Sequence, residues 1–275
     1  MDELRGRNAL ITGAGGGLGG YIARALAAEG VDLALTDLPA APVDGLAAEL
    51  RSRGVEAKHA PADLADAEER QRLAAWATET LGPLDLLVNN AGVEFGGSFL
   101  RMSQEELWAI VSVNLLAVMD LTRLVLPGML ERGRGHVVNV ASLAGKTPAP
   151  YLAAYAATKH GVVGFTHSLR AEYGADAVGF SAICPVFISR VGMYARVAAD
   201  LGDVPNPAGT LPPERVGEAV VRAVRDDLAE VVLSRRLMRP IIPLYAAFPR
   251  IVTRLVRNRR ALEFSERFAR ARGRL

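Results

Sequence analysis

Short apolar runs alternate along this chain with longer segments that carry a helical pattern. The predicted strands are residues 8–12, 31–36, 55–60, 84–88, 136–140, 178–184 and 231–233. The predicted helices are a stretch ending near residue 30 and residues 43–53, 66–81, 103–131, 151–173, 191–201 and 213–227. Continuously apolar strands that helices separate are typical of a parallel sheet with both faces covered. With right-handed crossovers, the expected fold is an α/β, doubly wound parallel sheet in a three-layer sandwich.

The composition excludes several classes of protein. Half of the 275 residues are hydrophobic and 23% are charged, which is typical of a globular chain and not of a disordered one. The formal net charge of +2 argues against a uniformly basic nucleic-acid-binding protein. Cys184 is the single cysteine, so no intramolecular disulfide forms, and no Cys/His spacing indicates a metal site. We find no signal-peptide pattern and no run of about 18 uninterrupted apolar residues, and therefore expect a cytoplasmic protein.

Charge is distributed unevenly between the body and the C-terminal tail. Residues 235–275 contain twelve arginines and two glutamates, a charge of +10, which leaves −8 on the first 234 residues. We therefore predict a single α/β domain in residues 1–235 and a basic amphipathic helical extension in residues 236–275. Apolar residues recur in the extension at helical spacing: Ile241, Leu244, Tyr245, Phe248, Ile251, Val252, Leu255 and Val256. Packing on the chain's own body or on another subunit is the expected role, and covering a lipophilic pocket or peripheral membrane contact are the alternatives.

A glycine cluster follows the first predicted strand. It runs Thr12-Gly13-Ala14-Gly15-Gly16-Gly17-Leu18-Gly19. Glycine permits positive φ and lets a pyrophosphate approach the backbone, and the next helix attracts that anion to its N-terminus. A phosphate-loop NTPase would need a lysine in this turn, and none is present. Taken alone, the cluster is equally consistent with a flexible turn, but its place after the first strand favours a dinucleotide.

Asp37 ends the second predicted strand, 24 positions after Gly13. A carboxylate at this place accepts hydrogen bonds from the adenosine ribose and repels a 2′-phosphate. The neighbouring Thr36, Leu38 and Gly16 are neutral, so no arginine is placed there to bind that phosphate. We therefore predict NAD, with NADP the less favoured cofactor. The alternative is an ordinary turn aspartate.

Tyr155 and Lys159 lie four residues apart on a predicted helix, so their side chains share one face. Proton transfer by a tyrosine requires its pKa to fall from about 10 toward neutrality, a change of ~4 kcal/mol. A cation at ~4 Å and an intermediate dielectric supplies about that much. Ser142 follows the fifth strand, where its hydroxyl can hold a substrate oxygen or stabilise a turn. The Tyr-Lys spacing alone is weak evidence, because it often arises by chance.

These residues resemble the motifs of the short-chain dehydrogenase/reductase family. Five elements match in order and spacing: Thr12-Gly13-x-x-x-Gly17-x-Gly19, Asn89-Asn90-Ala91-Gly92, Asn114, Ser142 and Tyr155-x-x-x-Lys159. The resemblance covers about residues 5–235 and is closer to the shorter branch of the family than to the epimerase-like branch. It implies a Rossmann-type domain that binds a dinucleotide and carries the catalytic residues.

The resemblance implies a role for each matching residue. Tyr155 would be the general acid/base, Lys159 would lower its pKa and hold the nicotinamide ribose, and Ser142 would orient the reacting oxygen. Asn114 would support a water that relays protons to Lys159. The implied cofactor-binding residues are Gly13, Gly16, Gly17, Leu18, Gly19, Asp37, Asp63, Leu64, Asn90, Ala91, Gly92, Tyr155, Lys159 and Ile188.

The loop after the sixth strand departs from the family pattern. Val186 stands where the family usually has glycine, and Arg190 where it usually has threonine, with Ser189 as an alternative source of the hydroxyl. Valine does not readily adopt positive φ. We therefore expect a different loop path beside the nicotinamide, which bears on the implied contact between its amide and the backbone of Ile188. The family resemblance also implies that Asp63 lies beside the adenine.

Substrate contacts are expected from apolar residues near these motifs. The candidate lining residues are Val93, Glu94, Phe95, Leu143, Tyr151, Phe187, Met193 and Tyr194, and the predicted substrate-binding residues are Ser142, Tyr151, Tyr155 and Phe187. Packing in the core is the alternative for each apolar residue. Residues 190–212, rich in Gly, Pro and Ala, are candidates for a mobile lid.

The leading hypothesis is an NAD(P)-dependent oxidoreductase, preferring NAD, that interconverts a lipophilic secondary alcohol and its ketone. A non-catalytic dinucleotide-binding scaffold and a membrane-surface interaction protein are the alternatives on the same fold. The joint presence of Asn114, Ser142, Tyr155 and Lys159 favours catalysis. The resemblance also implies a homodimer or homotetramer built on the helices at 103–131 and 151–173.

Overall fold

A seven-stranded parallel sheet forms the centre of the molecule, in the order β3-β2-β1-β4-β5-β6-β9. The computed structural model describes residues 3–174, 178–201, 206, 208–234, 241–256 and 259–271. The strands are β1 (Asn8–Thr12), β2 (Asp32–Thr36), β3 (Ala57–His59), β4 (Leu86–Asn89), β5 (Gly135–Val140), β6 (Val178–Pro185) and β9 (Glu230–Leu233). The strand order reverses between β1 and β4, so the ligand crevice is expected beyond their carboxyl ends.

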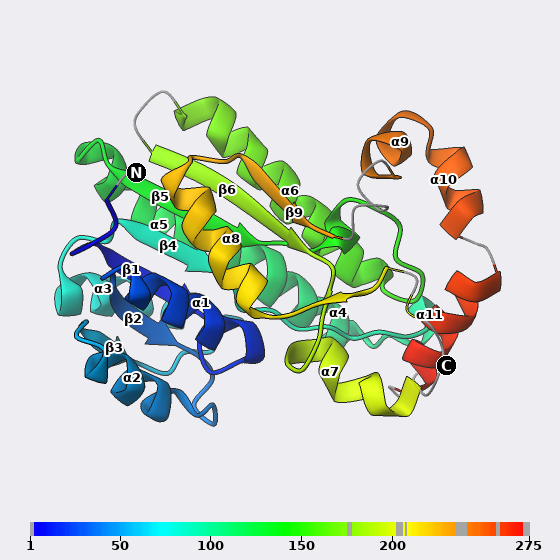
Figure 1. Ribbon diagram of the computed structural model, residues 1–275, viewed down its shortest axis with the longest axis horizontal. Coiled ribbons are helices and arrows are strands. Elements are labelled where there is room, and N and C mark those ends of the chain that lie inside the picture. The colour runs from blue at the N-terminus through cyan, green and yellow to red at the C-terminus, as the bar shows by residue number, and fades with distance from the viewer. Residues whose placement is uncertain are drawn as a thin grey trace.

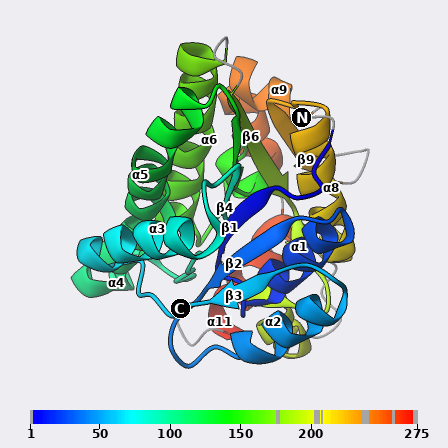
Figure 2. The same cartoon turned by 90° about the vertical axis from the view of Figure 1, so that its left-hand side faces the viewer.

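Helices cover both faces of this sheet. Figure 2 shows α1, α2 and α8 on one side and α3, α4, α5 and α6 on the other. Their bounds are α1 (Gly17–Ala28), α2 (Val43–Ser52), α3 (Ala67–Leu81), α4 (Gln104–Val111), α5 (Ala117–Glu131), α6 (Ala153–Tyr173) and α8 (Glu214–Arg225). The predicted doubly wound α/β sandwich is therefore confirmed.

Both faces of the sheet are buried by packing, and most residues of its strands are apolar. Ile11 and Leu33 lie in the cluster that packs under α1 and α8, whereas Leu10 and Leu87 lie in the cluster under α3 and α5. Gly217 of α8 allows a close helix crossing, since a Cβ there would lie 2.8 Å from the carbonyl oxygen of Tyr21 in α1. The strands are thereby held rigidly, with their carboxyl ends at one edge.

The predicted helix at 103–131 consists of α4, a π-helical turn (Ser112–Leu116) and α5. A capping box of Ser103 and Glu106 begins it. Residues Gln104–Glu131 are long and apolar enough to cross a membrane, with a mean hydropathy of 1.8 in the most apolar 18-residue window. However, 44% of that window is buried inside the fold, where Leu121 and Met129 pack in the core. These contacts account for part of its apolar character.

The C-terminal extension forms three helices, α9 (Ile241–Ala247), α10 (Pro249–Val256) and α11 (Arg259–Ala271), where a single helical segment was predicted. Figure 1 shows α9 and α10 projecting beyond the main body and α11 below them. Phe248 and Ile251 are 55% and 51% exposed, whereas Phe264 and Phe268 of α11 are each 4% exposed. The predicted boundary between residues 235 and 236 lies outside the described residues.

A second, two-stranded parallel sheet joins β7 (Phe187–Ile188) to β8 (Thr210–Leu211). It was not predicted, because two-residue strands carry no periodic signal. Between the two strands lie α7 (Gly192–Ala198) and a short 3₁₀ turn (Ala199–Leu201). This segment corresponds to the predicted lid, of which residues 202–205 and 207 are outside the described part of the chain.

Candidate active site

The glycine turn between β1 and α1 has no room for side chains. Gly13 adopts a φ of +68°, and a Cβ there would lie 2.8 Å from the Cα of Ala91. A Cβ at Gly19 would overlap the carbonyl oxygen of Gly13, and one at Gly17 would lie 2.6 Å from the backbone nitrogen of Gly192. These glycines present bare backbone at the N-terminus of α1. The turn therefore fits the pyrophosphate of a dinucleotide.

Thr12 connects this turn to the end of β4. Its Oγ1 accepts hydrogen bonds from the N–H groups of Asn90 and Ala91, each at 3.0 Å. The Nδ2 of Asn90 donates to the carbonyl oxygens of Thr12 at 3.0 Å and Gly13 at 3.1 Å. The predicted cofactor residues Asn90 and Ala91 thus lie beside the glycine turn and fix its position against the sheet.

Asp37 lies at the end of β2 against the same turn. Its Oδ2 accepts from the N–H of Gly16 at 3.0 Å, and its Oδ1 accepts from the N–H of Leu38 at 2.8 Å. A shallow cavity of about 210 Å³ beside the turn contains Arg24, whose guanidinium binds the carboxylate of Glu49 at 2.6 Å. Asp37 therefore places a negative charge at the turn, while Arg24 is bound to Glu49, a carboxylate that Arg53 also binds at 2.6 Å.

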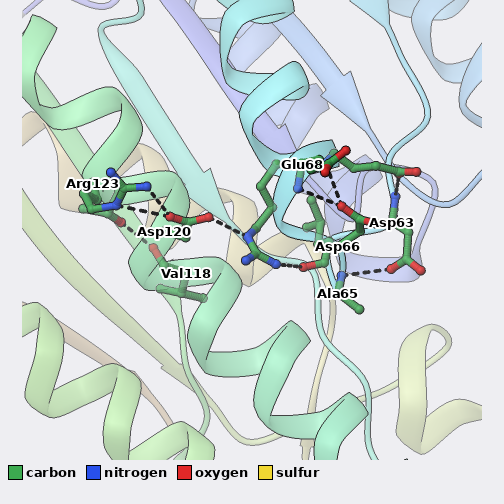
Figure 3. Close-up of polar contacts among 11 residues, drawn as sticks. Asp63, Ala65, Asp66, Glu68, Val118, Asp120 and Arg123 are labelled. Carbon is green, nitrogen blue, oxygen red and sulfur yellow. Dashed lines mark hydrogen bonds and ion pairs between the residues drawn. The ribbon is translucent and has the colours of Figure 1, made fainter.

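Asp63 belongs to a hydrogen-bonded turn before α3 (Figure 3), and Leu64 is the next residue of the chain. The Oδ1 of Asp63 accepts from the N–H of Ala65 at 2.9 Å, and the N–H of Asp63 donates to Glu69 at 2.5 Å. Leu64 is 6% exposed, and its carbonyl oxygen accepts from Arg70 at 2.7 Å. The side chain of Leu64 is thus a core residue, and Asp63 shapes the turn where the adenine contact was predicted.

Tyr155, Lys159 and Ser142 come together at the carboxyl edge of the sheet. Tyr155 and Lys159 lie one turn apart on α6, and Ser142 begins the turn that follows β5. The Nζ of Lys159 lies 5.7 Å from the ring centroid of Tyr155 and donates to the carbonyl oxygen of Val140 at 2.8 Å. Ser142 is hydrogen-bonded to Tyr155, and its Oγ also accepts from the N–H of Ala144 at 3.1 Å. A phenol, an ammonium and a hydroxyl therefore converge as the spacing predicted.

The electrostatics of this group differ from expectation. Burial raises the pKa of Tyr155 to about 12, an effect that the hydrogen bond with Ser142 opposes and the negative charge of Glu94 reinforces. Burial also lowers the pKa of Lys159 to about 8. The predicted fall of the tyrosine pKa toward neutrality is therefore not produced by the protein alone. The cost of desolvating the phenolate outweighs the stabilisation that the hydrogen bond with Ser142 provides.

Asn114 lies in the π-helical turn, and its side chain is fully buried. Its Oδ1 accepts from the N–H of Val93 at 2.8 Å, while its Nδ2 donates to the carbonyl oxygen of Val93 at 2.9 Å and to Thr158 at 3.3 Å. A Cβ at Gly92 would lie 3.2 Å from the Oδ1 of Asn114 and 3.7 Å from the Nζ of Lys159. Gly92 thus lets the asparagine and the lysine approach the same stretch of backbone. Such π-helical turns often occur at functional sites.

The loop after β6 accommodates Val186 without positive φ. Val186 is buried, and its N–H donates to the carbonyl oxygen of Leu233 at 2.9 Å, which extends the pairing of β6 with β9. The left-handed conformation falls instead on Arg190, with a φ of +66°, and its guanidinium binds Glu214. Positive φ therefore occurs at residue 190 and not at residue 186, and the different loop path beside the nicotinamide stays a prediction.

Ser189 and Ile188 take part in the pairing of β7 with β8. The N–H and the hydroxyl of Ser189 both donate to the carbonyl oxygen of Leu211, at 2.9 and 3.2 Å. In this structure the hydroxyl is hydrogen-bonded within the small sheet, and its use in place of the usual threonine stays a prediction. The side chain of Ile188 is buried in the core.

The predicted substrate residues lie on three segments around Tyr155. The loop after β4 carries Val93, Glu94 and Phe95, the region between β5 and α6 carries Leu143 and Tyr151, and the segment after β6 carries Phe187, Met193 and Tyr194. Two rings are in contact, with centroids 5.0 Å apart in Phe187 and Tyr194. Sequence reasoning missed Phe264 and Phe268 of α11, which pack on this group.

Comparison with known proteins identifies the family. Residues 7–202 match the family model described as short chain dehydrogenase. This chain belongs to the short-chain dehydrogenases. The ketoacyl reductase HetN of a Nostoc species is 35% identical over 276 residues, which cover 98% of this chain and 94% of the relative. A putative ketoacyl reductase of Streptomyces coelicolor is 40% identical, with 71% of this chain and 76% of the relative covered.

Solved structures of short-chain dehydrogenases show the same fold. A metagenomic short-chain oxidoreductase in complex with NADP has a TM-score of 0.71 and 31% identity, covering 84% of this chain and 97% of its own. A tryptophan-substituted variant of actinorhodin polyketide ketoreductase with NADPH has a TM-score of 0.75 and 32% identity, covering 85% and 97%. Both structures contain the phosphorylated dinucleotide.

Proposed function

We propose that this protein interconverts a secondary alcohol and its ketone with a nicotinamide dinucleotide, and that Tyr155 is the general acid/base. The observation that carries this proposal is the convergence of Tyr155, Ser142 and Lys159 at the sheet edge that also holds the glycine turn. The ketoacyl reductases among its relatives support a carbonyl as the reacting group.

Each residue of the site has a separate role in the proposed reaction. When bound, the nicotinamide supplies or accepts the hydride. The hydroxyl of Ser142 orients the substrate oxygen, and the hydroxyl of Tyr155 donates its proton to that oxygen during reduction or removes it during oxidation. The ammonium of Lys159 stabilises the phenolate from beneath the ring, and Asn114 holds the loop after β4 at Val93.

We infer that NAD is the preferred cofactor. The carboxylate of Asp37 lies beside the turn that would receive the pyrophosphate, where it would bind the adenosine ribose and a 2′-phosphate would meet a like charge. Arg24, the base in the adjacent cavity, is already bound to Glu49. The two solved relatives carry NADP and NADPH, so the affinities for NADH and NADPH are the measurement that decides. Tighter binding of NADPH by the wild type would refute this assignment, and Asp37→Ala should weaken NADH binding selectively.

A direct test of the proposed activity is the change in reduced-nicotinamide absorbance with a panel of lipophilic ketones and alcohols. Tyr155→Phe should lower kcat by about 100-fold or more, as expected for loss of a general acid, while the dissociation constant of NADH is unchanged. Unaltered turnover in that variant would rule out the assigned proton donor. Dinucleotide binding without turnover of any carbonyl in the wild type would favour the non-catalytic scaffold.

Two partners are proposed on separate surfaces. The exposed side chains of Leu107, Trp108, Leu116 and Met119 on α4, the π turn and α5 support a second copy of this chain as the occupant of that face. Phe248, which immediately precedes α10, and Ile251 on α10 are exposed. Arg250 and Arg254 lie on the same helix, which supports contact with an anionic membrane surface.

A further inference from the structure

The last helix of the chain is held to the body by an aromatic face. Phe264 and Phe268 lie four residues apart on α11, and each is 4% exposed. Glu263 and Arg267 lie on the other face, where they form an exposed ion pair at 3.2 Å. The phenylalanines therefore orient this helix by pointing inward, while this ion pair stays on the surface.

The inward face meets residues that follow β6. The ring centroid of Phe187 lies 5.6 Å from that of Phe264 and 6.0 Å from that of Phe268, and 5.0 Å from that of Tyr194 on α7. Val197 of α7 completes the cluster. Phe187 lies two positions after Pro185, the carboxyl end of β6, so α11 packs at the sheet edge at which ligands bind in this fold.

The same helix also reaches the segments that carry the reacting groups. A Cβ at Gly96 would lie 2.5 Å from the Oε1 of Glu94, 3.2 Å from Leu152 and 3.4 Å from the ring of Phe268. Leu152 immediately precedes α6, three residues before Tyr155. Phe268 is therefore next to the loop after β4 and next to the start of the catalytic helix.

We propose that Phe264 and Phe268 form the outer wall of the substrate site and contact the apolar body of the ketone whose oxygen is held by Ser142 and Tyr155. The substrate class that fits this wall is a ketone or secondary alcohol with an extended alkyl chain or a fused apolar ring, without charge next to the carbonyl. The inference rests on the proposed function and adds α11 as the element that determines specificity.

A chain-length comparison in the full-length protein tests this wall. The probes are acetone, which has no alkyl chain beyond its two methyl groups, and methyl octyl ketone, with NADH as reductant. For Phe264→Ala and Phe268→Ala we expect kcat/KM for methyl octyl ketone to fall by roughly tenfold, the effect of losing a few buried methylene contacts. The value for acetone should change by less than about twofold, because its carbonyl contacts are retained.

Control variants distinguish a loss of substrate contact at Phe264 and Phe268 from a general loss of folding or activity. Arg267→Ala lies on the exposed face of the same helix and should leave both ketones unchanged. Phe268→Leu keeps an apolar side chain at the position, so the helix stays docked while the ring is lost, and selectivity should fall partway. Equal losses for both ketones, or no loss for methyl octyl ketone, would overturn the proposal.

A binding measurement distinguishes this inference from the proposed activity. Calorimetric titration of methyl octyl ketone into the NADH-saturated protein should show affinity in the wild type and weaker affinity in Phe264→Ala. If binding of methyl octyl ketone depends on Phe264 but no turnover occurs, the proposed reaction is wrong and the role of α11 in substrate binding is supported. If acetone is turned over but methyl octyl ketone does not bind, the proposed reaction is supported and the role of α11 is wrong.

Discussion

The hydroxyl of Tyr151 donates a hydrogen bond to the carboxylate of Glu266 at 3.3 Å, which ties the segment before α6 to the C-terminal helix. Tyr151 also adopts a φ of +63°, and its carbonyl oxygen accepts from the N–H of Gly97 at 2.8 Å. Two contacts thus hold a residue in a left-handed conformation that tyrosine rarely adopts. Through them the β4 loop, the catalytic helix and α11 form one unit.

We expect Tyr151→Phe to loosen this unit without affecting the proton transfer. Loss of the hydrogen bond should cost about 0.5–1.5 kcal/mol of stability, measured by denaturant unfolding. The KM for a long-chain ketone should rise several-fold with kcat nearly constant, because the hydroxyl holds α11 and not the reacting oxygen. A loss of kcat as large as that of Tyr155→Phe would place this hydroxyl in the chemistry instead.

The pH dependence should have opposite signs in the two directions. Oxidation requires the deprotonated Tyr155, whose pKa is raised to about 12 by burial, so the oxidation rate should increase as the pH rises. Reduction requires the protonated phenol and should fall toward high pH. Glu94→Gln removes a charge that raises the tyrosine pKa, so its oxidation profile should shift to lower pH. Glu79→Gln, a surface change on α3, serves as the control, and coincident profiles for both variants would exclude this role of Glu94.

Lys159 should cost stability at neutral pH. Burial lowers the pKa of Lys159 from 10.5 to about 8, so the unfolded chain binds this proton more tightly than the folded chain does. The difference between the two pKa values corresponds to a loss of about 3 kcal/mol in the free energy of unfolding. This penalty is present below pH 8 and disappears as the pH rises toward 10.5. Lys159→Met should therefore be inactive yet no less stable at pH 7 in denaturant unfolding. Any gain in its free energy of unfolding over the wild type should vanish near pH 10, where the lysine of the wild type no longer carries this penalty. A variant that is markedly less stable than the wild type at pH 7 would contradict the stated cost.

The α4–α5 face should hold copies of the chain together. Trp108 is 60% exposed there, and a glutamate in its place would put a charge into an apolar contact. Trp108→Glu should reduce the mass measured by analytical ultracentrifugation to that of a single chain. Ile251→Glu, at an exposed apolar position on α10, should leave the mass unchanged. A wild type that sediments as a monomer would remove the basis for this interface.

Membrane contact through α10 should depend on both apolar insertion and charge. We expect the protein to float with phosphatidylglycerol vesicles and not with phosphatidylcholine vesicles, because each arginine near an anionic surface contributes about 1 kcal/mol. Phe248→Ala with Ile251→Ala, and separately Arg250→Gln with Arg254→Gln, should each reduce flotation. Arg267→Ala on α11 is the matched control. Equal flotation of all these variants would dismiss α10 as the contact.

Most of the sheet could be predicted because its signal is local. An unbroken apolar strand between two helices indicates a parallel, fully covered strand wherever it occurs, and the glycine turn after β1 marks the end of the sheet at which ligands bind. The four-residue spacing of Tyr155 and Lys159 likewise determines a shared helical face. The structure places these side chains as the spacing indicated.

The parts that could not be predicted depend on distant contacts. The π-helical turn at Asn114 follows from its hydrogen bonds to Val93, 21 residues away, which no helical periodicity records. The packing of Phe264 on Phe187 joins segments that are 77 positions apart in the sequence. The pKa of Tyr155 depends on burial by several elements at once, so a pairwise estimate from one lysine misjudged its direction.

Gly19 has a practical consequence for redesign of the enzyme. Because any side chain at this position would overlap the carbonyl oxygen of Gly13, the turn tolerates no exchange there, and mutant libraries that vary it will mostly yield inactive clones. Asp37 contacts the same turn from its rim, where that steric overlap does not apply. Engineering that aims to change which dinucleotide is consumed should therefore begin at the rim and leave the turn untouched.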